Sequence, residues 1–307
     1  MYPRNLTFYR FPRATNLSQL EELLPEHLCQ DVGPLALTST GFVSPFGGDS
    51  EVYVHRTGDS IWLTLEHQER MLPGAVVADA LAKRLDEFEE REGRRPLGAA
   101  RKRLRDDLIG ELLPRAFVRR RRTNILLNAR YGLLAVDAAG RKVADDAVTY
   151  LRLLLGSFPA VPLNAEIAPR AVLTGWLAGE SLPEYLRLGE EAELRDPIQG
   201  GAVVKVQHQE LQSEEVRNHL EAGKQCARLA LVYGDHLSYV LGEDLVVRKL
   251  KFLEGALESL DVDETSTDAV RAEIDARLHL AGAEIELLFS VLVVSFRLSS
   301  LEQQGRA

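Results

Sequence analysis

The sequence predicts an α+β fold with two sheet-containing lobes and an inserted helical hairpin. The chain has 307 residues, which is beyond the roughly 250–300 residues at which a single hydrophobic core stops growing. Segments with strand-like and helix-like patterns follow one another as β-α-β-β-(α-α)-β-β-α, the order of an α+β and not of an α/β protein. A linker-like stretch with glycine and prolines, 156–163, then separates a first lobe, 1–165, from a second, 166–307.

The first lobe is expected to hold a sheet with a helix near each end of its sequence. Residues 57–59 (Thr-Gly-Asp) are typical of the turn of a β-hairpin. Pro25 must bend or split the first helix, and Gly156 is placed to end the last one. The expected strands are 6–11, 51–56, 60–66, 123–128 and 133–137, and the expected helices are 18–28 and 141–155.

Two consecutive helices, 75–91 and 97–112, are predicted to form a helical hairpin inserted into this lobe at residues 74–117. Each helix has an apolar stripe at helical spacing, and Pro114 ends the second helix. A hairpin this exposed is too weak alone, and two such hairpins can form a four-helix bundle. The stripes are Val77, Leu81, Leu85 and Phe88 on the first helix, and Ala100, Leu104, Leu108 and Leu112 on the second.

The second lobe is expected to contain a three-strand meander and a long C-terminal helix. Ser213 is a plausible N-cap, because Glu214 and Glu215 follow it in the first turn of a helix that runs to about Ala222. The other expected elements are a short helix over 172–177, a strand at 202–206, the meander strands 225–233, 236–241 and 245–252, and a terminal helix over 268–301.

The positive charge of the chain is concentrated in one window. The formal net charge is -9, which by itself opposes binding to a polyanion. Residues 1–165 carry a net charge of +2 and residues 166–307 a net charge of -11. Within the first lobe, residues 94–122 hold 11 basic and 3 acidic side chains. Ten of the eleven are arginines, which bind phosphate bidentately, although a solvated helix face would have the same composition.

No catalytic motif or cofactor site is found. The sequence lacks GxxxxGK[ST], GxGxxG, GxSxG and HExxH patterns. Residues 41–48 are rich in glycine, but Pro45 removes a backbone donor and no lysine follows, so a plain loop is expected. His67 with Glu66 and Glu69, or His219 with Glu215, are weak metal-site candidates. We expect no catalytic residue, no metal and no cofactor.

The chain is expected to be a reduced, soluble, cytoplasmic protein. Cys29 and Cys226 lie far apart and outside any CxxC pattern, and Cys226 is expected to be a small buried apolar residue. The N-terminus has no apolar signal core. Residues 287–298 are the most lipid-like stretch, but they are short of the roughly 20 residues needed to cross a bilayer.

Four segments together resemble the signature regions of the RdgC family of recombination-associated proteins. They are Leu112-Leu113-Pro114-Arg115-Ala116-Phe117, Gly156-Ser157-Phe158-Pro159-Ala160-Val161-Pro162-Leu163, Leu173-Thr174-Gly175-Trp176 and the long, specific segment 213–224. The similarity is collinear over nearly the whole chain. It implies a ring-shaped homodimer that encircles double-stranded DNA without sequence preference, associates with the nucleoid and restrains the RecA recombinase.

The resemblance also implies roles for particular residues. It places Phe117 at the hairpin contact, inserted into the other subunit; by composition alone this aromatic either caps the local core or anchors a partner. Residues 207–209 are implied to lie near DNA, although relatives carry lysines where this chain has Gln207 and His208. The expected DNA-binding residues are Arg94, Arg95, Arg101, Lys102, Arg115, Arg119, Lys205, His208, Gln209 and Lys224, and the expected dimer contacts are Phe117, Leu104 and Leu108.

Two other functions stay open at this stage. The chain could act mainly by direct contact with the recombinase, with the acidic segment Asp261-Val262-Asp263-Glu264 attracting a basic partner surface. It could also be a metal-dependent nuclease that uses scattered acidic residues and histidines, which is the weakest of the three hypotheses.

Overall fold

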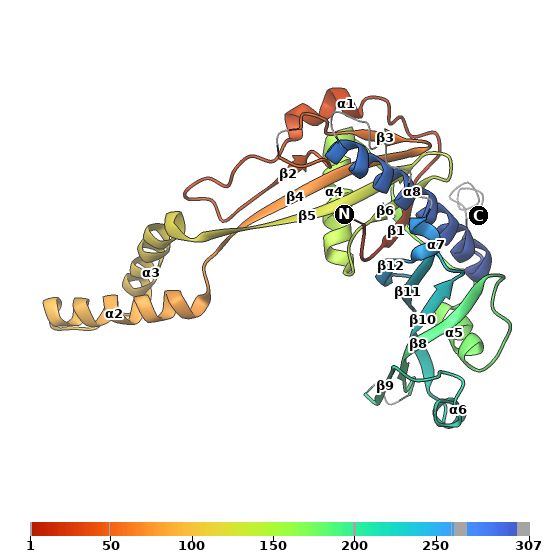
Figure 1. Ribbon diagram of the computed structural model, residues 1–307. Coiled ribbons are helices and arrows are strands. Elements are labelled where there is room, and N and C mark those ends of the chain that lie inside the picture. Colours follow the sequence, from red (N-terminus) through yellow and green to blue (C-terminus); the bar gives the residue numbers. More distant parts are fainter. Residues whose placement is uncertain (1, 49, 199–200, 259, 261–268, 300–307) are drawn as a thin grey trace. The chain divides into compact units, whose positions relative to one another are not determined.

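The protein is a mixed α and β structure whose described part contains two antiparallel sheets and eight α-helices. The computed structural model describes residues 2–48, 50–198, 201–258, 260 and 269–299 (Figure 1). By compactness the chain forms two units. We call residues 1–24, 44–64 and 123–307 the main unit, and residues 25–43 and 65–122 the hairpin unit.

The first sheet has seven strands in the order β2-β4-β5-β6-β1-β7, with β3 paired to β4. Its inner strands are buried: Ile125, Leu127 and Leu133 have no exposed surface. The register of β1 on β6 pairs Phe8 with Ala135. The strands are β1 (Thr7–Arg10), β2 (Thr38–Val43), β3 (His55–Thr57), β4 (Ser60–Met71), β5 (Phe117–Asn128), β6 (Leu133–Val136) and β7 (Val161–Pro162).

Two helical segments accompany the strands of the first sheet. Pro25 splits the first as expected, into α1 (Leu20–Leu23) and a 3-10 helix (Leu24–His27). The second is α4 (Arg141–Leu155), which has the predicted bounds and ends at Gly156 with a φ of 69°. Tyr9 of β1 donates a 2.6 Å hydrogen bond to Asp145 of α4. These two helices therefore follow from apolar spacing and turn residues alone.

The second sheet has five strands in the order β12-β11-β10-β8-β9. The predicted meander corresponds to its β10, β11 and β12. On the core side, Thr174 of α5 accepts a 2.9 Å hydrogen bond from the backbone N–H of Cys226. The elements are α5 (Pro169–Leu177), β8 (Leu186–Arg195), β9 (Val203–Gln207), α6 (Glu214–Glu221), β10 (Gln225–Tyr233), β11 (Leu237–Gly242), β12 (Val247–Phe252), α7 (Glu254–Leu257) and α8 (Ala269–Phe296).

Within the main unit, both sheets and α8 share one hydrophobic core. Phe8 of the first sheet packs with Phe289 of α8 at 5.9 Å between ring centroids, and Leu229 of the second sheet belongs to the same buried cluster. The expected boundary near residue 165 stays a prediction, because compactness divides the chain along a different line. By length and composition, residues 270–296 could cross a bilayer, and half of the apolar stretch is buried inside the protein.

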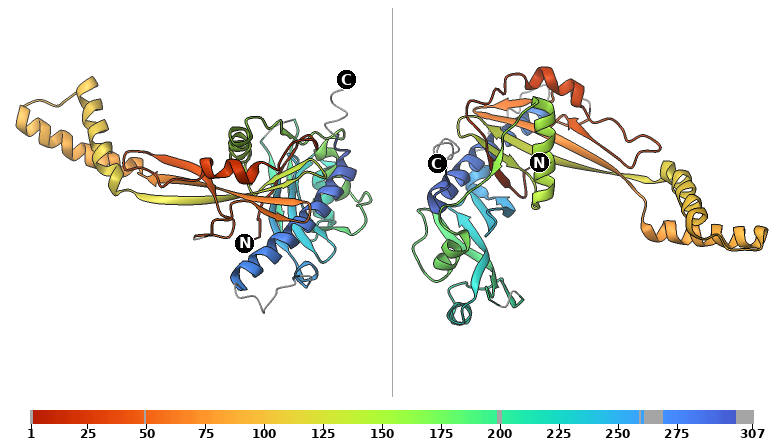
Figure 2. Two further views of the ribbon diagram at one scale, coloured as in Figure 1. Left: turned by 90° about the horizontal axis from the view of Figure 1, so that it is seen from above. Right: turned by 180° about the vertical axis from the view of Figure 1, so that it is seen from behind.

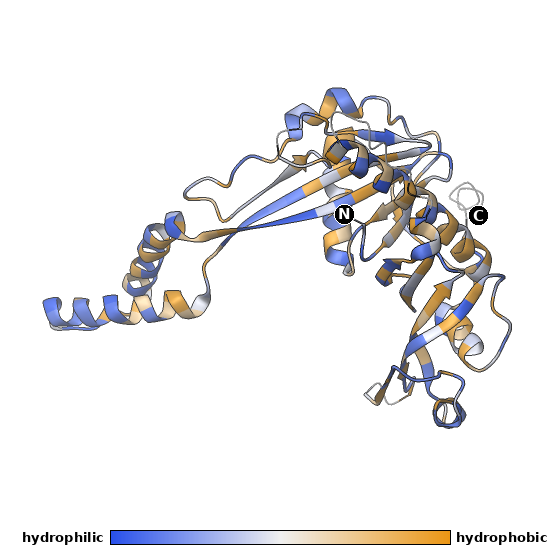
Figure 3. Ribbon diagram, in the orientation of Figure 1, coloured by the Kyte–Doolittle hydropathy of each residue, from blue (hydrophilic) through white to orange (hydrophobic). Residues whose placement is uncertain are grey.

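The hairpin unit contains α2 (Gly74–Glu92), α3 (Gly98–Leu112) and a 3-10 helix (Leu113–Arg115). The two views of Figure 2 show α2 and α3 as consecutive helices joined by a short turn. Leu81, Leu85 and Leu108 form their small shared core. Figure 3 shows α2 changing from an apolar beginning to a polar end. Few side chains hold this pair together, and much of its surface is left exposed.

Several predicted elements were wrong in extent. Strand β8 was missed, because its Gly189 and its charged residues hide the alternation; Gly189 packs so closely on Ala230 that a Cβ would lie 2.9 Å from the alanine Cβ. Strand β5 begins at Phe117 and not at Thr123, and β2 includes residues 41–43 of the expected loop. Of the expected strand 51–56, only its last two residues lie in β3. The acidic segment 261–264 lies outside the described residues.

Candidate nucleic-acid interface

The turn before α3, the exposed side of α3 and the strand that follows present a row of free cations. Asp106 and Asp107 lie on the same helix and reduce its net charge. Exposed guanidinium groups without partners keep their donors available for phosphate oxygens. Seven exposed cations have no hydrogen bond or ion pair with any described residue: Arg94, Arg101, Lys102, Arg103, Arg105, Arg115 and Arg121.

Two of the expected DNA-binding arginines are instead paired within the hairpin unit. Arg95 contacts Asp86 at 3.0 Å, and Arg119 contacts Glu69 at 2.7 Å. All four side chains are more than two-fifths exposed, and exposed pairs of this kind contribute only about 0–1 kcal/mol to stability. A phosphate could therefore replace either carboxylate at little cost.

The run Arg119–Arg122 on β5 divides into two kinds of side chain. Arg122 donates a 2.9 Å hydrogen bond to Glu66, a carboxylate whose side chain is 5% exposed, and Arg120 pairs with Asp31 at 2.8 Å. A buried carboxylate needs such partners, because an isolated buried charge is costly. Arg121 points to neither acid. It is therefore a better candidate for phosphate contact than its neighbours.

An apolar groove of about 580 Å³ runs between α2 and α3, and arginines line it on one side. Its floor is made by α2, with Val77, Leu81 and Leu85 among the lining residues. Arg95, Arg101 and Arg105 all line it. The structure thus brings together two of the predicted DNA-binding residues, and it adds Arg105 to them.

The three expected dimer contacts differ in their environment. Phe117 is 86% exposed at the start of β5, so it does not cap the local core. Leu108 is 5% exposed and packs on Leu81 and Leu85 of its own chain, and Leu104 is half-buried beside them. Leu108 thus serves the hairpin's own core, whereas Phe117 is free to meet another molecule.

The backbone before Phe117 is held by one side chain, Arg70 of β4. Its guanidinium donates to the carbonyl oxygens of Leu113, Pro114 and Ala116 at 3.1, 3.3 and 3.3 Å. It also donates to the carbonyls of two residues in the 25–43 segment, at 3.2 Å each. Arg70 therefore fixes the position from which the exposed aromatic side chain projects.

The expected DNA-binding residues of the second sheet lie on β9 and in two loops. Lys205 is exposed on β9, and His208 is exposed directly after that strand with a φ of 55°. The amide of Gln209 donates to Ser213 and Glu215 at 3.3 and 3.0 Å, so it organises the start of α6. Lys224 follows the turn after α6, and its half-buried side chain has no partner among the described residues.

Three basic residues of the second sheet were missed by sequence reasoning. Arg228 on β10 and Arg248 and Lys249 on β12 line the same cleft as Lys205. Arg228 stands alone among apolar residues, and Arg248 and Lys249 lie in the half of the chain whose net charge is negative, so charge counting along the chain did not point to them. Their convergence depends on the pairing of β8, β9, β10, β11 and β12, which no local sequence pattern specifies.

The described residues contain no group of three or more His, Cys, Asp or Glu side chains arranged to hold a metal ion. His67 shares a 2.7 Å hydrogen bond with Thr40, and Glu66 and Glu69 are paired with arginines. Burial raises the pKa of the Cys226 thiol to about 12. Cys226 is completely buried, which confirms the prediction that it is a small apolar residue.

The fold and the site define a class: a two-sheet α+β protein with a basic helical hairpin and an exposed aromatic residue at its base. Comparison with known proteins is more specific. The model of a family described as "Putative exonuclease, RdgC" matches residues 1–298. The chain belongs to the RdgC family.

Curated relatives match the chain along its whole length. A recombination-associated protein RdgC from Xanthomonas axonopodis pv. citri (strain 306) is 56% identical over 303 residues, covering 98% of this chain and 100% of the relative. Proteins of the same name from Xanthomonas campestris pv. campestris (strain B100) and Stenotrophomonas maltophilia (strain R551-3) are 55% and 52% identical with the same coverage.

Proposed function

We propose that the protein is a non-enzymatic, sequence-independent double-stranded DNA-binding protein that acts in recombination as a homodimer around the duplex. The observation that carries this proposal is the set of exposed cations on the hairpin unit that have no partner among the described residues. The name of the relatives, recombination-associated protein, supports the biological setting. No cofactor is required for this function.

Charge neutralisation supplies the affinity in this proposal. DNA carries about one negative charge per 1.7 Å of helix axis, and each phosphate that a cation neutralises releases a counterion. The proposed contacts are these seven cations of the hairpin unit, the exposed Lys205 and the half-buried Lys224. Flexible arginines on a helix surface read phosphates and not base edges, so the binding would be independent of sequence.

Dimerisation supplies retention on DNA. Phe117 exposes 86% of its surface, and the apolar groove between α2 and α3 lies in the same unit. An exposed aromatic side chain and an apolar groove on one chain form a self-complementary pair, as a twofold interface requires. Closure of two chains around the duplex would then slow dissociation even where contacts are few.

Restraint of the RecA recombinase follows from occupation of the duplex needed for strand exchange. A protein with this role would lie on the nucleoid in the cytoplasm. The alternative is direct contact with the recombinase, and a pull-down in the presence of nuclease separates the two. Loss of the recombinase after nuclease treatment supports DNA occupation, and its persistence supports direct contact.

Retention on circular DNA tests the proposal directly. The protein is loaded on a nicked circle at low salt, challenged with high salt and then exposed to a restriction enzyme that cuts once. An encircling dimer stays on the circle after the challenge and is lost after the cut. Equal release before and after cutting, or single subunits in solution scattering at working concentration, would overturn it. The variant Phe117→Ala should be lost from the circle without cutting.

A further inference from the structure

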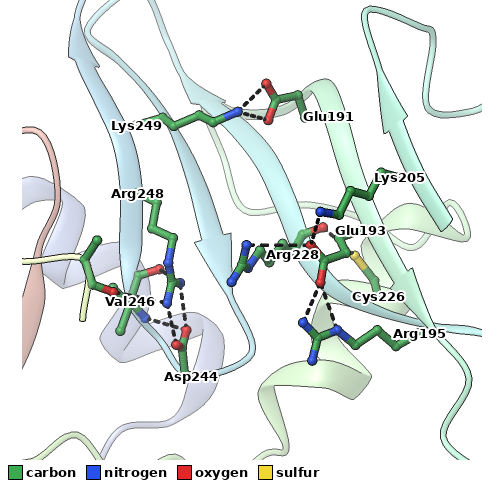
Figure 4. A network of polar contacts seen from close by, with 11 residues as sticks. Glu191, Glu193, Arg195, Lys205, Cys226, Arg228, Asp244, Val246, Arg248 and Lys249 are labelled. Carbon is green, nitrogen blue, oxygen red and sulfur yellow. Dashed lines mark hydrogen bonds and ion pairs between the residues drawn. The ribbon is translucent and has the colours of Figure 1, made fainter. Parts of the chain in front are cut away.

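The open face of the second sheet carries a charged cleft of about 170 Å³ (Figure 4). Strands β8, β9, β10 and β12 contribute charged side chains to it, and the buried Ala192, Val206 and Val240 are among its lining residues. Its charged lining residues are Glu191, Glu193, Lys205, Arg228, Arg248 and Lys249. The cleft lies entirely within the main unit.

The two acidic lining residues, Glu191 and Glu193, and Asp244, which pairs with the lining residue Arg248, each have a close cationic partner. Lys249 donates to both oxygens of Glu191 at 2.7 and 2.6 Å. Arg248 donates to both oxygens of Asp244 at 3.0 and 2.6 Å. Although burial opposes ionisation of Asp244, the hydrogen bonds and charge of Arg248 hold the pKa of this carboxyl below its ordinary value.

The third acid, Glu193, is buried, and Arg195 donates to it through two nitrogens at 2.8 and 2.7 Å. Figure 4 shows three cations gathered around this one carboxylate.

Arg228 and Lys205 are left over once these pairs are made. Their nitrogens lie 3.6 and 4.0 Å from Glu193, beyond the 2.7–3.2 Å of a hydrogen bond. Neither side chain donates a hydrogen bond to any described residue. Two positive charges, one with the planar fork of a guanidinium, therefore converge on the cleft with their donors unused.

The backbone of β12 adds an independent observation. Lys249 has a φ of 52°, in the left-handed region, although it is neither a glycine nor in a turn. Such a conformation costs on the order of 1–3 kcal/mol and is concentrated at functional sites. The register of β11 on β12 shifts beside it, between Ser238 and Val240. The strained residue delivers its ammonium group to the edge of the cleft.

We propose that this cleft binds a phosphate group, with Arg228 and Lys205 as its donors and Lys249 at its rim. The excess of two positive charges matches a phosphate oxyanion, and a guanidinium fork fits its oxygens. A volume of about 170 Å³ is below the roughly 300 Å³ at which pockets for drug-sized ligands begin. The cleft therefore takes the phosphate group and leaves the rest of a larger ligand outside.

The phosphate has two possible sources, a backbone phosphodiester of DNA and a free phosphate ion. Binding of a DNA phosphodiester rests on the proposed function, whereas binding of a free phosphate ion does not. Titration of the full chain with inorganic phosphate, against sodium chloride of matched ionic strength, tests the site without DNA. Binding of a short duplex, measured by fluorescence anisotropy, tests the first source.

Arg228→Gln and Lys205→Gln should each weaken phosphate binding by about tenfold, the effect of losing one charge-assisted hydrogen bond. Arg187→Gln is the matched control, because Arg187 is exposed on β8 outside the cleft and loses the same charge. Glu193→Gln should strengthen phosphate binding, since it removes the competing carboxylate. A merely structural role of Glu193 would not produce this gain.

The outcomes of these measurements decide whether the phosphate site exists and which source of phosphate it binds. If phosphate binding is absent from the wild type, or equal in Arg228→Gln and Arg187→Gln, the site does not exist. If phosphate and duplex binding fall together in Arg228→Gln, the cleft holds a backbone phosphate. If only phosphate binding falls, the cleft serves a free phosphate. A chain that binds phosphate but no duplex at all would refute the proposed function and leave the phosphate site standing.

Discussion

The guanidinium of Arg70 donates a 3.3 Å hydrogen bond to the carbonyl oxygen of Ala116, the residue directly before the exposed Phe117. Four further backbone carbonyls accept hydrogen bonds from the same group. One charged side chain thus joins β4, the end of α3 and the segment before β2. Because five donors of one arginine are fixed in a plane, all of these carbonyls are held in a single arrangement.

Substitution of Arg70 is therefore expected to affect Phe117 through the backbone. Arg70→Lys keeps the charge but replaces the fork by a single ammonium, so several carbonyls lose their donor. We expect the free energy of unfolding to fall by about 2 kcal/mol, with weaker dimerisation, measured by chemical denaturation and sedimentation. Arg56→Lys is the control, because Arg56 forms an ion pair with Glu21 within the main unit, whereas Arg70 and Phe117 belong to the hairpin unit. Equal effects in the two variants would contradict a positioning role.

Phe117→Ala should separate assembly from folding. Since Phe117 is 86% exposed, its removal should change the free energy of unfolding by no more than about 0.5 kcal/mol, while dimerisation and retention on DNA fall. Leu108→Ala is the contrasting variant, because it opens a cavity beside Leu81 and Leu85 and should cost about 3 kcal/mol. A collapse of the melting temperature in Phe117→Ala would show that this residue belongs to the core.

The helices and strands of the fold were predictable where the apolar pattern and the turn residues along the chain match the side chains that are buried in the structure. Helix α4 and strand β10 have the predicted bounds, since an apolar stripe and a glycine stop define the first, and a nearly continuous apolar run that ends at the turn Gly234-Asp235 defines the second. Strand β8 could not be found in this way. Its Glu191 and Glu193 lie in the cleft of the second sheet, and two of their cationic neighbours, Lys249 and Arg228, come from strands that are distant in sequence.

The candidate site was predictable as a basic window but not residue by residue. Of the run 119–122 the sequence prediction named only Arg119, which the structure pairs with Glu69. Arg122 neutralises the buried Glu66, and Arg121 has no partner among the described residues. The arginines of this run differ in their partners because successive residues of β5 lie on opposite faces of the strand, and Glu66 and Glu69 of β4 pair with Arg122 and Arg119. Phe117 was left between a core role and a partner role, which its exposure of 86% resolves against the core.

Duplex binding should therefore distinguish Arg121 from Arg122. Arg121→Gln removes one proposed phosphate contact, so the slope of log affinity against log salt should become shallower by about one. Arg122→Gln should destabilise the protein, because it leaves Glu66 with a weaker set of partners. Anisotropy titrations at several salt concentrations, with two unrelated duplexes, provide the measurement. An Arg121→Gln effect confined to one duplex would indicate base-specific contact.

Charge reversal in the turn before α3 tests the expected contribution of Arg94 and Arg95. Arg94→Glu should weaken binding more than Arg95→Glu, because Arg95 is already paired with Asp86 at 3.0 Å and Arg94 has no partner among the described residues. Both should weaken binding to all sequences about equally. The same titrations measure both variants, and a larger effect at Arg95 would show that its ion pair is given up on DNA.

The proposal of a non-enzymatic protein needs its own test, since the matching family is described as a putative exonuclease. We expect no shortening of linear duplex DNA and no nicking of circular DNA after incubation with magnesium or manganese ions, the metals on which phosphodiester hydrolysis commonly depends. Gel electrophoresis of end-labelled DNA provides the measurement. Metal-dependent release of label that persists through purification, and that is lost in an acidic-residue variant, would establish a nuclease.

The stability of the protein should depend on pH through His236. A 2.8 Å hydrogen bond with Glu284, together with the nearby charge of Asp235, raises the pKa of this imidazole above its ordinary value of 6.5. The folded state then favours the protonated ring. Its contribution to stability is fully present below about pH 6.5, the ordinary value for an unfolded chain, and is lost as the pH rises through the higher folded pKa.

His55 should act with the opposite sign, because burial lowers the pKa of its ring despite the carboxylate of Asp275 beside it. The contribution of His55 to stability is therefore lost as the pH falls. The melting temperature of the wild type as a function of pH thus reflects both His55 and His236. The difference in melting temperature between the wild type and His236→Gln isolates one of them and should shrink as the pH is raised from about 6 to about 9. The exposed His208 provides the control variant His208→Gln. A difference that stays constant over this range would mean that His236 stabilises the fold by packing and not by its charge.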